Sequence, residues 1–74
     1  MPRTLDARVA REGAEERYAR YSREARGLMQ DADHEAHNGN WRQAAVRTHA
    51  VIQILAAAAG TCQELSLLYM LTEE

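Results

Sequence analysis

The sequence predicts an all-α fold: an antiparallel two-helix hairpin that dimerises into a four-helix bundle. Two stretches place apolar residues at helical spacing, and a short segment with Asn and Gly separates them. The second stretch is apolar on more faces than one neighbouring helix can cover. The 74 residues make a single domain with a small core, and a chain of this size gains stability by associating.

The first helix is expected over residues 5–37. Its apolar positions are four and three residues apart in alternation and form one narrow stripe. These positions are Ala14, Tyr18, Tyr21, Ala25, Leu28 and Ala32. Arg and Glu occupy the other faces, several of them four residues apart, a spacing that allows ion pairs across one turn. This helix is therefore amphipathic, with one buried side.

A turn is expected at residues 38–40. Gly39 can adopt the left-handed conformation that ends a helix. Asn40 is a good N-cap residue, and Gln43 stands three residues later, at capping-box spacing. Because the connection is so short, the two helices should be antiparallel neighbours.

The second helix is expected over residues 41–72. Its main stripe is Trp41, Ala44, Thr48, Val51, Leu55, Ala58, Cys62, Leu65 and Tyr69. A second stripe beside it contains Ala45, Ile52, Ala56 and Ala59, and a third contains Val46, Ala50, Ile54, Ala57 and Leu68. Gly60 and Thr61 also have the pattern of a helix stop followed by an N-cap. The main stripe keeps its phase past Gly60, which favours one continuous helix.

These stripes predict two sets of contacts. The hairpin core is expected to contain Tyr18, Tyr21, Leu28, Trp41, Val51, Leu55, Cys62 and Leu65, with Tyr21 over Ala58 and Ala59. The side of the second helix away from the first is expected to form the oligomer interface, through Val46, Ala50, Ile54, Ala57 and Leu68. A homodimer is the simplest solution, and a helical protein partner is the alternative.

Composition argues against several classes of protein. The net charge is −2, and the arginines of the first helix are interleaved with glutamates, so a strongly basic nucleic-acid binder is not indicated. The single cysteine, Cys62, fits a reducing compartment, and we expect a cytoplasmic protein. The most apolar window, residues 50–62, is too short to span a bilayer and there is no secretory signal, so no membrane association is expected.

Residues that carry chemistry are sparse. Asp33, His34 and His37 have spacings that allow two of them to share a metal ion from one helix face. The second helix has no matching motif, so this pattern favours a solvated helix end, with His37 near the negative end of the helix dipole. The sequence contains no catalytic Ser/His/Asp arrangement, no Gly-rich phosphate loop and no CxxC. We therefore expect no metal site, no cofactor and no enzymatic activity.

Two partial resemblances accompany this interpretation. The turn residues Gly39, Asn40, Trp41 and Ala44 resemble the inter-helix turn of tetratricopeptide repeats, which implies a helical hairpin. The tail from Tyr69 to Glu73 resembles the Tyr-x-x-x-Asp/Glu tail of the secreted WXG family, which are dimerising helical hairpins. The Trp-x-Gly turn of that family is replaced here by Trp41-Arg42-Gln43.

The function predicted from the sequence is that of a small, non-catalytic assembly or interaction protein, which acts through self-association or through a helical partner. A WXG-like secreted hairpin protein is one alternative. The other is an accessory protein that associates with nucleic acid through the arginines of the first helix.

Overall fold

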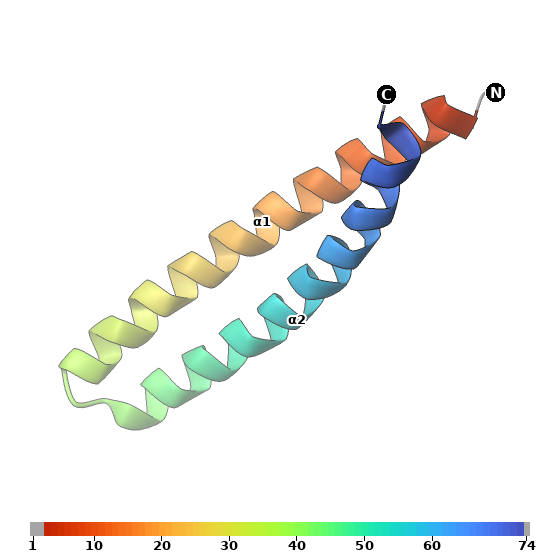
Figure 1. Cartoon of the computed structure of the whole chain (residues 1–74). Coiled ribbons are helices and arrows are strands. Elements are labelled where there is room, and N and C mark those ends of the chain that lie inside the picture. Colours follow the sequence, from red (N-terminus) through yellow and green to blue (C-terminus); the bar gives the residue numbers. More distant parts are fainter. Residues whose placement is uncertain (1–2, 74) are drawn as a thin grey trace.

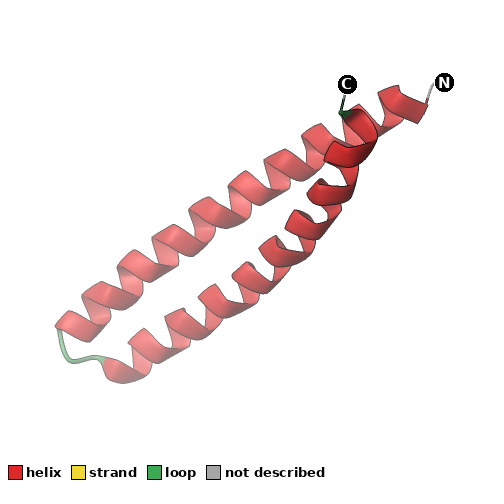
Figure 2. Cartoon of the chain, in the orientation of Figure 1, coloured by secondary structure: helices red, strands yellow, loops and turns green. Residues whose placement is uncertain are grey.

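The computed structural model describes residues 3–73 as two helices, α1 (Arg3–His37) and α2 (Trp41–Thr72) (Figures 1 and 2). The helices run antiparallel along their length, and the C-terminal end of α2 lies beside the early turns of α1. The molecule is a thin rod of 56 × 17 × 14 Å. The structure therefore confirms the predicted all-α class and the antiparallel hairpin.

The helix limits lie close to those expected from the stop and start signals. α1 begins two residues before the predicted start, at Arg3, and ends at His37. α2 begins at Trp41 and continues to Thr72 without a break at Gly60. Glycine weakens a helix but does not terminate it when the backbone bonds on both sides remain in place.

The turn between the helices is closed by backbone hydrogen bonds. Gly39 has a φ of +79°, which is the left-handed conformation expected of a residue that ends a helix. Its N–H donates to the carbonyl of Ala36 at 3.0 Å, and the N–H of Asn40 donates to the carbonyl of Glu35 at 2.8 Å. Together these two bonds form a Schellman motif.

The predicted capping box does not form. The Asn40 side chain makes no capping hydrogen bond to α2. Its amide instead donates to the Glu35 carboxylate at 3.0 Å, across the turn. The side chain that was expected to begin α2 therefore joins the start of α2 to the end of α1.

The contact between the helices is built largely on alanine. The buried apolar residues are Ala14, Ala25, Ala32, Ala44, Val51 and Ala58, and the buried polar residues are Thr61 and Thr72. Such small side chains allow the two helix axes to approach closely. Larger residues on the same faces are half-buried: Tyr21, Leu28, Ile54, Leu65 and Leu68. The core is thus a single line of residues along the length of the rod.

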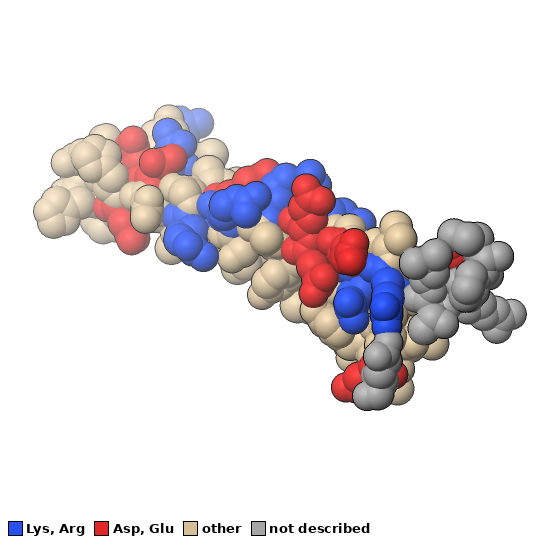
Figure 3. Space-filling model, turned by 90° about the horizontal axis from the view of Figure 1, so that it is seen from above, with Lys and Arg blue, Asp and Glu red and all other residues tan. Residues whose placement is uncertain are grey.

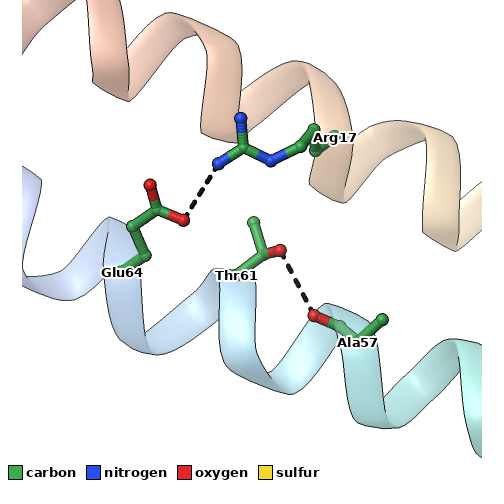
Figure 4. Close-up of polar contacts among 4 residues, drawn as sticks. All are labelled: Arg17, Ala57, Thr61 and Glu64. Atoms are coloured by element: carbon green, nitrogen blue, oxygen red, sulfur yellow. Dashed lines mark hydrogen bonds and ion pairs between the residues drawn. The ribbon is translucent and has the colours of Figure 1, made fainter.

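Polar contacts across the helices define the register of the hairpin. Arg17 donates to Glu64 at 2.9 Å (Figure 4). Arg11 donates to Thr72 at 2.9 Å. In this register Tyr21 of α1 lies at the level of Ala58 of α2. A large residue then faces a small one, which is the arrangement that dense packing requires.

Candidate assembly surface

α2 has two stripes of opposite character. The first, which we call the seam, is buried or half-buried at every position. Its members are Ala44, Arg47, Val51, Ile54, Ala58, Thr61, Leu65, Leu68 and Thr72. The second, which we call the outer stripe, is exposed at every position: Trp41, Ala45, Thr48, Ile52, Leu55, Ala59, Cys62, Ser66 and Tyr69. In both stripes the spacings of three and four residues alternate, which is the pattern of a coiled-coil contact face.

The outer stripe is apolar although it faces water. Trp41 is 70% exposed, Ile52 60% and Leu55 52%. The remaining members are small or aromatic, and none of the nine is charged. The stripe runs about 42 Å along α2 at ~1.5 Å per residue. Monomeric soluble proteins rarely expose a continuous apolar strip of this length.

The structure places the residues of the expected hairpin core in three different environments. Val51 is buried, whereas Tyr21, Leu28 and Leu65 are half-buried against the opposite helix. The other members of the expected core lie outside the contact and are exposed: Tyr18, Trp41, Leu55 and Cys62. Of these, Trp41, Leu55 and Cys62 belong to the outer stripe, so the structure corrects their assignment.

The residues expected at the oligomer interface are also divided. Val46 and Ala57 are exposed, as a free interface would require. Ile54 and Leu68 are half-buried in the seam, and Ala50 is half-buried beside it. Ile54 and Leu68 therefore contact α1 rather than facing away from it, whereas Val46 and Ala57 remain open together with the outer stripe.

This difference arises because α2 is apolar on several faces. Periodicity shows that stripes exist, but it does not show which stripe faces α1. In the structure the close contact is made by positions that carry small residues, among them Ala44, Ala58 and Thr61. They meet the buried alanines of α1, among them Ala14 and Ala25. Small residues do not by themselves identify the seam in the sequence, because the outer stripe also carries them.

One flank of the hairpin is charged. Arg17 and Glu64 form an ion pair at 2.9 Å, and Asp31 and Arg47 form a longer one at 3.9 Å. The first pair joins the two helices near the middle of the rod, beside the Thr61 hydroxyl (Figure 4). Basic and acidic side chains also mix along the face seen in Figure 3. This surface is typical of a face that stays in water.

A cluster of four side chains fastens the open end of the hairpin. The Arg11 guanidinium donates to the Thr72 hydroxyl at 2.9 Å and lies 5.4 Å from the centre of the Tyr69 ring. The Tyr69 hydroxyl donates to the Glu15 carboxylate. This hydrogen bond, helped by desolvation and the negative charge of Glu15, raises the pKa of Tyr69 above its ordinary value of 10.0. The cluster holds the last turns of α2 against α1.

The histidines near the turn make local contacts. His34 lies 3.2 Å from the side-chain nitrogen of Asn38 in the turn, and His49 lies 3.3 Å from that of Gln53 one turn further along α2. Within residues 3–73, the structure places no group of three or more His, Cys, Asp or Glu side chains where they could hold a metal ion.

By length and composition alone, α2 is long and apolar enough to cross a membrane, which differs from the expectation that its apolar window is too short. Core helices of soluble proteins pass the same test but are mostly buried, whereas 17% of the apolar window of α2 is buried. The ion pairs Arg17–Glu64 and Asp31–Arg47 tie the charged helix α1 to it along its length. If α2 spanned a bilayer, these charges would lie beside hydrocarbon, where charged side chains are costly. We therefore retain a water-soluble hairpin as our proposal.

Comparison with known proteins adds no assignment: no family model, no curated protein and no solved structure matches this chain. The resemblances to tetratricopeptide turns and to the WXG tail remain predictions.

Proposed function

We propose that this protein is a small, non-catalytic assembly protein that acts by associating with itself or with a helical partner through the outer stripe of α2. The observation that supports the proposal is the exposure of all nine positions of this stripe. A surface without charges, with apolar residues at coiled-coil spacing, is the kind of surface that a second helix covers. We place the protein in the cytoplasm because its lone cysteine is free.

Burial of the outer stripe would add stability to a hairpin whose own core is small. The buried apolar residues in the described part of the chain are five alanines and one valine, so each contributes little apolar area. Apolar burial stabilises by about 25 cal/mol per Å². Covering Trp41, Ile52 and Leu55 would remove much larger side chains from water.

The test is sedimentation equilibrium at micromolar concentration, with a charge placed in the stripe. We expect the wild-type chain to sediment as a dimer or a larger assembly, and Leu55→Glu to sediment as a single chain. The matched control is Gln53→Glu, which adds the same charge at an exposed position outside the stripe. We expect it to associate like the wild type. A well-folded wild-type monomer would contradict self-association.

The choice of Leu55 follows from the structure. Ile54 is the adjacent residue, but it is half-buried in the seam. A glutamate at that position would disrupt the hairpin itself, so loss of association would not identify the surface. Circular dichroism of Leu55→Glu provides the necessary second measurement, because a variant that dissociates and remains helical has lost the interface rather than the fold.

A further inference from the structure

We infer that the occupant of the outer stripe is a second copy of this chain, whose α2 packs antiparallel to the first with the two-fold axis beside Leu55. The inference rests on the proposed function and adds the partner, the orientation and the register. It is derived from the angle between the two stripes, the order of residue sizes along the outer stripe and the surface area of the chain.

The angle between the two stripes fits a bundle of four helices. From Ala45 to Tyr69, each outer-stripe position follows a seam position by one residue, as Ala45 follows Ala44 and Leu55 follows Ile54. One residue corresponds to about 100° around an α-helix. A helix at the corner of a four-helix bundle has its two neighbours in directions separated by nearly a right angle. The seam therefore faces α1, and the outer stripe faces the position of a further helix.

The order of side-chain sizes favours the antiparallel orientation. Leu55 is the fifth of the nine positions, so an antiparallel copy centred there places Trp41 opposite Tyr69 of the second copy and Ile52 opposite its Ala59. A large residue then meets a small one beside the axis, and two aromatic residues meet at each end. A parallel copy would stack Ile52 on Ile52 and leave the two Ala59 residues facing each other without filling the space between the helices.

The surface area of the hairpin matches the requirement of a dimer. A compact monomer of 8.3 kDa is expected to expose about 4,600 Å². This chain exposes 5623 Å². The excess, roughly 1,000 Å², is close to the ~800 Å² that each partner contributes to a standard stable interface. One copy is therefore sufficient to cover the surplus, and the charged flank of Arg17–Glu64 remains in water.

Disulfide trapping tests the orientation, because Cys62 is free and belongs to the outer stripe. Centred on Leu55, the antiparallel dimer separates the two native Cys62 residues by about 21 Å along the axis at ~1.5 Å per residue. The same register puts Thr48 of one copy opposite Cys62 of the other. A disulfide requires Cα atoms within about 7 Å. Under mild oxidation we expect Thr48→Cys to form covalent dimers and the wild type to remain free of them.

Val46→Cys is the matched control, since Val46 is exposed on α2 but outside the outer stripe. It should cross-link no faster than the wild type. Efficient Cys62 cross-linking in the wild type would show a parallel dimer and overturn the orientation, although the sedimentation result and the proposed function would stand. Equal cross-linking of Val46→Cys and Thr48→Cys would overturn the register. Monomeric sedimentation combined with flotation on phosphatidylcholine vesicles would show that a membrane covers the stripe, and would overturn the inference and self-association together.

Discussion

Thr61 and Thr72 are the polar residues buried at the contact between the helices. Each hydroxyl donates to a backbone carbonyl one turn earlier in α2, that of Ala57 at 3.2 Å and that of Leu68 at 2.8 Å. A threonine bonded in this way is satisfied within its own helix, as Thr61 is, and Thr72 also accepts a hydrogen bond from Arg11 of α1. It then occupies little more space than a valine, which explains how a polar residue can stand at a seam position.

At the same scale, the Tyr69–Glu15 hydrogen bond makes stability depend on pH. The folded chain holds the phenol proton more tightly than the unfolded chain, because the pKa of Tyr69 is raised above 10.0. The stabilisation is complete below this pH and is lost as the pH rises through the folded-state pKa. We expect the thermal midpoint to fall as the pH rises above 10.0 and passes through the raised pKa of Tyr69. Circular dichroism should show a smaller fall for Tyr69→Phe, and an equal fall would exclude this hydrogen bond as the cause.

Ala58 provides a residue-scale test of the register. It is 8% exposed and lies at the level of Tyr21, so Ala58→Leu should overpack the contact and lower the free energy of unfolding by about 1–3 kcal/mol. The neighbouring Ala57 is exposed, and Ala57→Leu is the control that leaves the contact unchanged. Urea unfolding measures both. Equal stability of the two variants would show that Tyr21 faces another part of α2.

At the scale of the element, the two glycines Gly39 and Gly60 should respond in opposite directions to alanine. Gly39 has a φ of +79°, so Gly39→Ala forces a side chain into the left-handed region and should destabilise the chain by about 1–2 kcal/mol. Gly60 lies inside α2, and an added Cβ there meets nothing within 4 Å. Gly60→Ala should stabilise by roughly 1 kcal/mol. Urea midpoints that move in the same direction would contradict this account of the turn.

Some features of the two helices can be predicted from the sequence and others cannot. Gly39 and the two periodic stretches were enough to predict the helices and the turn. The face that α2 turns toward α1 was predicted only in part: Val51 and Leu65 lie at the contact as expected, whereas Leu55 is exposed. Leu55 and Ile54 are equally apolar neighbours that differ by about 100° in direction, so hydropathy does not show which of them faces α1. Residue size does not decide between them either, because small residues occur in both stripes, as Ala58 in the seam and Ala59 in the outer stripe show.

At the scale of the whole molecule, the hairpin is asymmetric around its long axis. One flank carries the ion pairs Arg17–Glu64 and Asp31–Arg47, and the outer stripe carries none of the charged residues of α2. A hairpin with charge on every flank would remain single, and one with apolar residues on every flank would assemble without limit. Val46, Leu67, Met70 and Leu71 are also exposed outside the outer stripe, but they do not form a stripe at regular coiled-coil spacing. Pairing of two outer stripes would give a closed assembly, in which each copy covers the stripe of the other.

A closed dimer also makes thermal stability depend on protein concentration. If folding and association are linked, the thermal midpoint depends on protein concentration, because mass action favours the associated state. A tenfold increase is equivalent to about 1.4 kcal/mol per dimer, which should raise the midpoint by roughly 3–6 °C for a dimer of this size. Leu55→Glu should melt at a lower temperature that does not change with concentration, whereas Gln53→Glu should follow the wild type. A wild-type midpoint that stays constant over a hundredfold range of about 1–100 μM would mean that the outer stripe is not buried by a second copy at these concentrations.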